Sequence, residues 1–510
     1  MTKPRETTFQ IRQLEFYEFG EYEMIDAEIL FITSLQEDLP SRFDPSLVES
    51  VRKFIRDCNF TALNKQVEVI PTHGLARVPY LLLVSVGGDP LDSIDRWREA
   101  AALAMKTVKR LNLHKLVVGL PESLILGSGL ASHVIINELT EGFLLGNYEI
   151  HSYQQVKKPM NSLKEINFVV DSLDEPGKLE MERHIGKAQV YSEATNYARD
   201  LTNLPGNLLT PEALAEEAGK LAERFGFEII VYNEQEIIEQ GMYGLHHVGK
   251  GSMHPPRMIV MKYQGLENWT DVLGLVGKGI TFDTGGISLK KPEGMEEMVS
   301  DMGGAAVLLG VMQALGELRP KVNIVVVLPA AENMPSGNAY KPGDIIPTLS
   351  GKTIEVLNTD AEGRIVLADG ITLAKQLGAQ KIIDVATLTG AILVSLGDVA
   401  TGAITNDDLF LRELLTAAER SGEKLWQLPA YPEYKEMLKS DVADVKNATT
   451  GRLAGAITAG LFIGLFAEKT PWIHLDTGGT AWLWHERGIH PKGGTGAMVR
   501  TLIRMICTEQ

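Results

Sequence analysis

This sequence lacks three things: more than a trace of cysteine, a long hydrophobic run, and an excess of positive charge. Its 510 residues include only two cysteines, Cys58 and Cys507, near opposite ends of the chain. Two cysteines so placed form neither a disulfide framework nor a cysteine zinc site, which is typical of a reducing compartment. The longest run of small apolar residues, Ala454 to Ala467, is too short to span a bilayer. We therefore interpret it as a buried helix.

The charge balance is strongly acidic. The chain has 49 Lys and Arg against 66 Asp and Glu, which gives a formal net charge of -17. Such a chain is a poor general binder of nucleic acid or of anionic membranes. The first ten residues are polar and contain no apolar segment, so we expect no signal peptide. We predict a cytoplasmic protein that binds no membrane and whose main role is not nucleic-acid binding.

The first third of the chain has the pattern of an α/β unit. The apolar share of 44% and the charged share of 23% are typical of soluble globular proteins. Strand-like and helical patterns alternate up to about residue 165, which predicts a mainly parallel sheet. The expected strands are 25–33, 80–86, 114–120 and 164–171, and the expected helices are 95–111 and 132–148.

A domain junction is predicted after this unit. Residues 174–177 have the composition of a turn, and 179–200 that of one long helix rich in Glu and Ala. We assign residues 1–178 to an N-terminal α/β domain, 179–200 to a linker helix and 201–510 to a larger domain. In the larger domain, strands are expected at 228–232, 257–263, 271–277, 321–329, 381–386 and 472–475, helices at 302–318, 365–377 and 412–421, and loops at 331–344 and 434–455.

One heptapeptide, residues 358–364 (NTDAEGR), carries the clearest chemical signal. It follows a strand-like segment at 353–357 and precedes the helix expected at 365–377. Asp360 and Glu362 are two residues apart in a turn, so their carboxylates can converge above a strand end, and Arg364 adds a cation. This corner is a candidate cradle for metal and anion. The alternative is an acidic helix N-terminus that only complements the helix dipole.

A second stretch upstream makes the signal specific. Residues 276–286 (VGKGITFDTGG) are followed by Lys290 and then by Asp301. With these residues in this order and spacing, the chain resembles the leucine aminopeptidase (cytosol aminopeptidase) family of two-metal peptidases. The heptapeptide matches that family's signature at every position. The resemblance extends from about residue 195 to the C-terminus and is thin before it.

The resemblance implies a fold and an assembly. The fold is a smaller N-terminal α/β domain plus a larger C-terminal catalytic α/β domain, 201–510, with a central mixed sheet flanked by helices. The family forms homohexamers of two trimers with the catalytic domains at the centre. The segment Ala454 to Ala467 is apolar all round and rich in small residues, which suits either the core of one subunit or an interface between subunits.

The resemblance also implies two divalent metal ions, Zn²⁺ or Mn²⁺. Lys278, Asp283, Asp301 and Glu362 hold the tighter ion. Asp283, Asp360 and Glu362 hold the more exchangeable ion, so Asp283 and Glu362 bridge the pair. A lysine must be neutral to bind metal, and two nearby cations with burial lower its pKa. The residues alone also allow Lys278 to be a counter-ion of the acids.

Two further cations are assigned catalytic roles by the resemblance. The metal ions polarise the scissile carbonyl and activate a water molecule. Lys290 matches the lysine that stabilises the developing oxyanion; its alternative is a solvated surface lysine, like its neighbour Lys291. Arg364 matches the arginine that holds a bicarbonate ion as general base, and its alternative is a salt bridge to a neighbouring acid.

The expected substrate is a peptide with a free N-terminus. Met298, Thr387 and Gly390 match positions that line the pocket for the first side chain, which is leucine or another, mainly apolar, residue. A methionine provides an adaptable apolar wall, although Met298 taken alone is also consistent with core packing. The free amino group of the peptide binds the exchangeable ion.

Other functions fit the sequence less well. Another two-metal hydrolase, such as a phosphoesterase, usually draws ligands from histidines. Here His246, His247 and His254 lie in a loop-like region without the spacing of a zinc site, and no HExxH occurs. Residues 127–132 superficially resemble a dinucleotide loop but lack its third glycine, which favours a turn before a helix. Some members of the family also bind DNA or regulate genes, and the charge of -17 argues against that as the main function.

Overall fold

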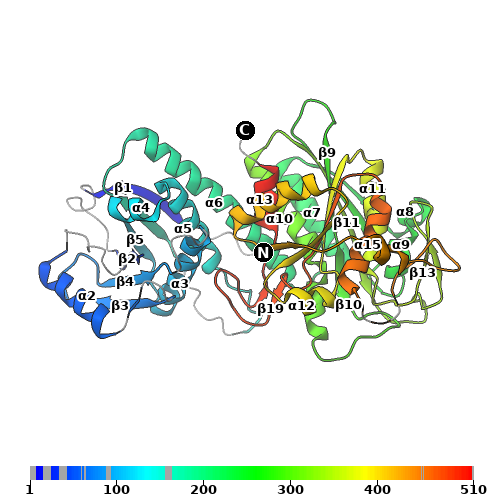
Figure 1. The fold of residues 1–510 in the computed structure, drawn as a ribbon, viewed down its shortest axis with the longest axis horizontal. Coiled ribbons are helices and arrows are strands. Elements are labelled where there is room, and N and C mark those ends of the chain that lie inside the picture. Colours follow the sequence, from blue (N-terminus) through cyan, green and yellow to red (C-terminus); the bar gives the residue numbers. More distant parts are fainter. Residues whose placement is uncertain are drawn as a thin grey trace. The chain divides into compact units, whose positions relative to one another are not determined.

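The computed structural model describes residues 7–14, 25–33, 43–58, 60–61, 65–87, 94–155, 163–449, 451 and 453–507. The chain divides into two compact units (Figure 1). The N-terminal unit is Met1–Glu193 with Glu486–Pro491, and the C-terminal unit is Ala194–His485 with Lys492–Gln510.

The N-terminal unit contains a six-stranded sheet in the order β1-β6-β5-β2-β4-β3. Its strands pair in parallel except β3 with β4, so the prediction of a mainly parallel sheet is confirmed. Its strands are β1 Thr8–Gln13, β2 Ala27–Ile32, β3 Val67–Pro71, β4 Tyr80–Ser85, β5 Lys115–Leu120 and β6 Glu165–Val170, and its helices before residue 150 include α2 Pro45–Asp57, α3 Asp95–Leu111, α4 Glu122–Ser128 and α5 Ser132–Gly146. All six side chains of β2 are buried, as expected of a strand covered on both faces.

The long helix α6 spans Glu175–Thr202, and the boundary between the two units falls within it. The turn predicted at 174–177 is wrong, because Glu175 begins the helix and Asp174 lies directly before it. Asp174 Oδ1 accepts a hydrogen bond from the backbone N–H of Gly177 at 2.9 Å, in the manner of an N-cap. Pro176 also suits a first helical turn. A Pro-Gly pair has the composition of a turn, but here the capping aspartate before it decides the structure.

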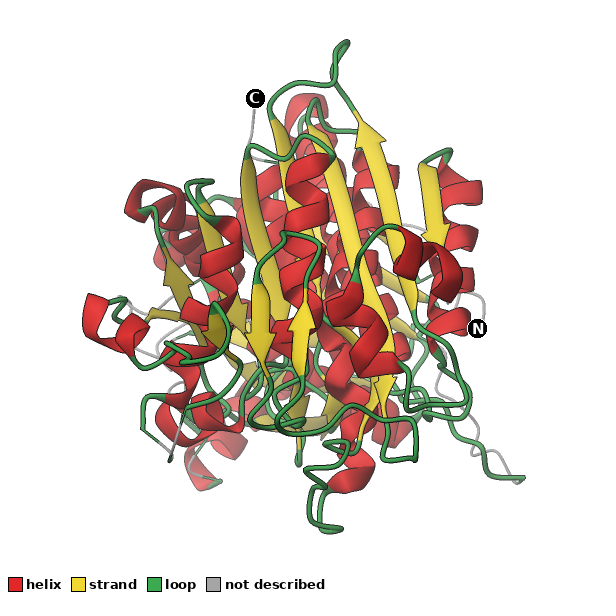
Figure 2. Cartoon of the chain, turned by 90° about the vertical axis from the view of Figure 1, so that its right-hand side faces the viewer, coloured by secondary structure: helices red, strands yellow, loops and turns green. Residues whose placement is uncertain are grey.

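The C-terminal unit is built on a nine-stranded mixed sheet in the order β16-β15-β18-β14-β9-β11-β8-β7, with β10 paired to β11. Figure 2 shows helices in front of and behind this sheet. Its strands are β7 Glu228–Tyr232, β8 Arg257–Gln264, β9 Val272–Gly277, β10 Gly279–Asp283, β11 Asn323–Asn333, β14 Lys381–Ala386, β15 Thr401–Thr405, β16 Leu425–Gln427 and β18 Trp472–Asp476. The α/β fold with a mixed central sheet is therefore confirmed.

The central strand β11 is buried along its whole length. It pairs in parallel with β9 and antiparallel with β8. The loop predicted from residue 331 begins later than expected, because Ala331 to Asn333 continue the strand by pairing with β10. The change from an apolar run to Ala-Glu-Asn hid this extension from the sequence pattern.

The helices that position the site pack on this sheet. They include α7 Pro211–Phe225, α9 Tyr243–Gly249, α10 Gly303–Leu318, α11 Gly363–Gln376, α12 Gly390–Leu396, α13 Asp408–Ser421 and α15 Gly455–Ala467, with a 3₁₀ helix, η1, at Met295–Met302. Helix α15 packs against α11 and contributes Phe462 and Phe466 to the core, which confirms the prediction of a buried helix for this apolar run.

Among the residues that the structure describes, one continuous helical stretch, Met295–Leu318, is long and apolar enough to cross a membrane by length and composition. In the structure, 89% of its most apolar window is buried inside the protein. The core helix of a soluble protein has the same character, so this stretch is weak support for a membrane span.

Candidate active site

The predicted site residues gather at the carboxyl ends of neighbouring parallel strands. Lys278 lies between β9 and β10, and Asp283 is the last residue of β10. Asp360 and Glu362 lie in the turn that precedes α11, whose cap residue is Glu362. The carboxyl end of a parallel sheet is where α/β proteins usually bind their ligands.

Lys278 lies at the buried centre of the site and is only 2% exposed. Its Nζ is 2.7 Å from Asp301 Oδ2 and 2.8 Å from Glu362 Oε1. It also donates to the backbone carbonyl of Thr387 at 3.2 Å. Lys278 therefore pairs directly with two of the acids that are its predicted fellow ligands.

Lys290 joins the other two acids. Its Nζ is 2.6 Å from Asp283 Oδ2 and also contacts Asp360 Oδ1. Its side chain is 22% exposed, so it is not the freely solvated surface lysine of the alternative interpretation.

Three of the acids form a group that could hold a metal ion. One carboxylate oxygen each from Asp283, Asp360 and Glu362 lies within 4.8 Å of the others. Glu362 Oε2 is buried and has no hydrogen-bond partner among the described residues, although a buried polar atom normally has one. Hard oxygen donors that converge in this way suit divalent cations. The residues present therefore fit a metal.

The electrostatics of the site agree with this. Burial alone would lower the pKa of Lys278, but the carboxylates around it, Asp301 and Glu362 foremost, raise it above the ordinary lysine value. The pKa of Lys290 is raised in the same way, chiefly by Asp283. Burial raises the pKa of Asp301 and of Glu362. Two ammonium groups do not balance the carboxylates gathered here, and added positive charge would stabilise them.

Two asparagines that the sequence analysis missed hold the heptapeptide in shape. Asn447 Oδ1 accepts from the backbone N–H of Leu357 at 2.8 Å, and its Nδ2 donates to the carbonyl of Asn358 at 2.6 Å. Asn333 Nδ2 donates to Asp283 Oδ1 at 2.8 Å and to the carbonyl of Thr359 at 2.9 Å. Single asparagines in a loop-like and a strand-end context carry no motif, so no sequence signal singled them out.

The glycine of the heptapeptide is required by close packing. A Cβ on Gly363 would lie 2.5 Å from Cε of Lys278. Gly285 has a φ of +86°, and a Cβ there would lie 2.6 Å from Asp360 Oδ1. Both glycines let the backbone approach the charged side chains, and Gly285 also adopts a conformation that favours glycine.

Arg364 is 9% exposed, and its Nη1 donates to the carbonyl of Asn447 at 2.8 Å. Burial lowers its pKa to about 10. Within the described part of the chain it makes no ion pair, so the alternative of a salt bridge is not what the structure contains. Its Nε–H is buried without a hydrogen-bond partner there, which leaves one donor for a bound anion.

The three predicted pocket residues lie on adjoining segments. Thr387 Oγ1 donates to Asp301 Oδ1 at 2.8 Å, so Thr387 borders the lysine and acids directly. Met298 lies in η1, which also carries Asp301. Gly390 is the first residue of α12, capped by the side chain of Thr389.

The histidines differ from expectation. His246 and His247 lie in helix α9 and not in a loop. Two other histidines, His133 and His184, come together with Glu180 in the N-terminal unit, and the sequence analysis missed them. Residues 127–132 contain the end of α4 and the start of α5, with Gly129 at a φ of +69°, so they form the predicted turn before a helix.

Fold and site together define the class of protein: a two-domain α/β protein with a carboxylate-rich site, suited to divalent metal, at the strand ends of its larger sheet. Residues 31–157 match the N-terminal domain of the cytosol aminopeptidase family, and residues 196–503 match its catalytic domain. The chain belongs to the cytosol aminopeptidase family, whose members are hydrolases that act as aminopeptidases.

Relatives and solved structures agree with this assignment. A protein of Bacillus licheniformis described as "Probable cytosol aminopeptidase" is 42% identical over 96% of this chain and 98% of its own. A protein of Bacillus subtilis with the same description is 50% identical over 71% of this chain and 72% of its own. A mutant of tomato leucine aminopeptidase is similar in structure, with a TM-score of 0.86 and 30% identity over 99% of this chain and 97% of its own. The bottromycin maturation enzyme BotP in complex with Mn has a TM-score of 0.82 and 33% identity over 94% of this chain and 98% of its own.

Proposed function

We propose that this chain is a metal-dependent leucyl aminopeptidase that removes N-terminal leucine and other, mainly apolar, residues from peptides. The observation that carries the proposal is the group of oxygens from Asp283, Asp360 and Glu362, which lie within 4.8 Å of one another beside two lysines. A metal-dependent peptidase needs such a site to hold positive charge near a carbonyl and a water molecule.

Two divalent ions, Zn²⁺ or Mn²⁺, are the proposed cofactors. Lys278, Asp283, Asp301 and Glu362 would hold one ion, and Asp283, Asp360 and Glu362 the other. When bound, such ions polarise the carbonyl of the substrate and lower the pKa of a bound water. Support comes from the hard oxygen donors and from the unpartnered Glu362 Oε2. Manganese is present in the similar structure of BotP.

The lysines have separate tasks in this proposal. Lys278 pairs with Asp301 and Glu362 and must release its proton before it binds an ion. The pKa of Lys290 is raised by the acids around it, so Lys290 keeps its charge and can donate a hydrogen bond to the substrate's carbonyl oxygen as negative charge develops there.

Arg364 is proposed to bind a bicarbonate ion that acts as general base. Its buried guanidinium holds one N–H without a partner among the described residues, and its other contact, with the Asn447 carbonyl, fixes its position. A buried, charged guanidinium with an unpartnered N–H suits a small anion.

Substrate selection is assigned to Met298, Thr387 and Gly390. An adaptable methionine and a small residue at the start of α12 suit an apolar first side chain of varied shape. The free amino group of the peptide would bind the exchangeable ion, which accounts for the restriction to N-terminal residues.

A homohexamer and a cytoplasmic location complete the proposal. Support for the location comes from the relatives, which are described as cytosol aminopeptidases. Family membership alone supports the hexamer, because helix α15, the apolar run that could also have formed an interface, is largely buried within its own unit. Light scattering at micromolar concentration measures the assembly directly.

Hydrolysis of a leucyl amide tests the function. We expect activity with added Mn²⁺, Zn²⁺ or Co²⁺, loss after chelation, and recovery when metal is returned. A phosphomonoester assayed in parallel tests the alternative that the protein is a two-metal phosphoesterase. Turnover of the phosphomonoester with none of the amide would overturn the proposal.

A further inference from the structure

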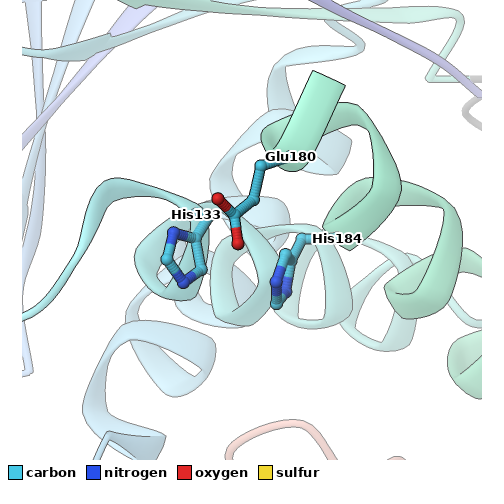
Figure 3. Close-up of side chains that lie close together, drawn as sticks. All are labelled: His133, Glu180 and His184. Atoms are coloured by element: carbon cyan, nitrogen blue, oxygen red, sulfur yellow. The ribbon is translucent and has the colours of Figure 1, made fainter. Parts of the chain in front are cut away.

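A second group of candidate metal ligands lies in the N-terminal unit, apart from the site described above. One ligand atom each from His133, Glu180 and His184 lies within 4.8 Å of the others. Figure 3 shows the Glu180 carboxylate and the two imidazole rings pointing toward one another from two helices. The ring centroids of His133 and His184 are 4.6 Å apart, with 35° between the ring planes.

Regular helical geometry produces this arrangement. Glu180 and His184 are four residues apart on α6, so their side chains lie on one face of the helix. His133 is the second residue of α5. A rigid scaffold of two helices therefore presents two nitrogens and one oxygen to a common point, as in many metal sites built from regular elements.

Without a metal, the contacts of these residues are weak. Neither imidazole makes a side-chain hydrogen bond among the residues that the structure describes. Glu180 approaches Arg183 at 3.8 Å, with both side chains about half exposed, and exposed pairs of this kind contribute little. The interactions in the structure thus leave the three ligand groups available to bind an ion.

We propose that His133, Glu180 and His184 form a binding site for a transition-metal ion, best suited to Zn²⁺, with water in the fourth position. Two imidazoles and a carboxylate are a ligand set that zinc accepts. In a tetrahedral site with bonds of about 2.0–2.1 Å, ligand atoms are roughly 3.3 Å apart, so rotations of the flexible Glu180 and of the two rings suffice to close the group. A bound ion would join α5 to the first half of α6.

Zinc X-ray absorption on the full-length, zinc-loaded protein tests this site separately from the active site. The candidate ligands of the active site include no histidine, so imidazole scattering that is lost in the His133→Ala/His184→Ala double variant reports the N-terminal group. The wild-type protein should show imidazole scattering and bind one more zinc per chain than the His133→Ala/His184→Ala double variant, counted by elemental analysis after equilibrium dialysis.

A matched control is His151→Ala, which removes an exposed histidine of the same unit that contacts only Tyr153 among the described rings. It should keep the wild-type zinc content and spectrum. Hydrolysis of the leucyl amide should be equal in all three proteins, which shows that the double variant is folded. Equal zinc contents in the wild type and the double variant, or a wild-type spectrum without imidazole, would overturn the proposal whether or not the protein is a peptidase.

Discussion

Nζ of Lys278 lies 2.8 Å from Oε1 of Glu362, and the pair is buried at the centre of the site. The lysine comes from the junction of two strands and the glutamate from the turn before α11. A second acid, Asp301, holds the same ammonium group at 2.7 Å. Glu362 has two roles, as a partner of the buried Lys278 and as a proposed metal ligand. Because Asp301 also pairs with Lys278, removing Glu362 takes away the metal ligand without leaving the lysine unpaired.

Glu362→Ala should therefore leave the fold intact and abolish metal binding and activity. The lysine keeps Asp301 as a partner, whereas the proposed bridging ligand is lost. Loss of turnover by more than about 100-fold is expected, since even indirect supports of metal ligands often cost 10- to 100-fold. Glu317→Ala, at an exposed ion pair with Arg224, is the control. Near wild-type turnover with two metals per chain in Glu362→Ala would falsify the ligand assignment.

Lys290→Ala should reduce kcat with the metal content unchanged. Removing one donor to a developing oxyanion typically costs about 100- to 1000-fold in kcat. The adjacent exposed residue supplies a control, Lys291→Ala, which should behave as wild type. Steady-state kinetics and elemental analysis measure both quantities. Loss of metal from the Lys290 variant would instead give this lysine a structural role.

Arg364→Ala should lose most activity and regain part of it when bicarbonate or another small base is added. The buried guanidinium holds the proposed anion in place. Without it, a base dissolved in the buffer can act as general base, but less efficiently than an anion held in position. The readout is the dependence of kcat on bicarbonate concentration in the variant and the wild type. If neither protein responds to such anions, the proposed role for bicarbonate is wrong.

Gly363→Ala should destabilise the site because its added methyl group would clash with the side chain of Lys278. The added Cβ would lie 2.5 Å from Cε of Lys278, and overpacking of a tight interior typically costs about 1–3 kcal/mol. We expect a lower thermal midpoint and weaker metal binding. Gly219→Ala in α7 is the control, because a Cβ there meets nothing within 4 Å and alanine favours a helix. Equal stability of the two variants would contradict the tight packing.

Asp369 should make stability fall as pH rises toward neutrality. Burial raises the pKa of Asp369 to about 7, although hydrogen bonds from the backbone N–H groups of Leu349 and Leu245 lower it in part. From about pH 4 to pH 7 the folded chain keeps a proton that the unfolded chain has released, so the free energy of unfolding decreases across this window. Asp369→Asn should flatten the profile of thermal midpoint against pH. Identical slopes in both proteins would assign the effect to other groups.

The sequence predicted the elements with a strong local pattern. Helix α3 was placed at its observed bounds, and the buried strands β9 and β14 within a residue, because apolar periodicity alone defines such elements. The heptapeptide and Lys278 were predicted to meet, and they do. The resemblance to a family, more than the spacing, carried that prediction, since no local rule brings residues so distant in sequence together.

What escaped prediction depends on tertiary contacts. The side-chain amides of Asn333 and Asn447 form hydrogen bonds with backbone groups that lie far away in the sequence. The histidines His133 and His184 meet only because the fold brings a residue of α5 close to a residue of α6. The start of α6 was misplaced because Asp174, a cap that acts on the backbone of Gly177, outweighs the turn character of the residues after it.

The hydrogen bonds from Asn447 to the heptapeptide turn also bear on how the protein is made. A chain is synthesised from its N-terminus and folds as it emerges, so Asn447 leaves the ribosome after every candidate ligand has already done so. Until then the Asn447 side chain is not there to bond the N–H of Leu357 and the carbonyl of Asn358, at the start of the turn. A nascent or truncated chain that ends before Asn447 would therefore carry all the candidate ligands of the active site and still lack the hydrogen bonds that hold the turn in shape.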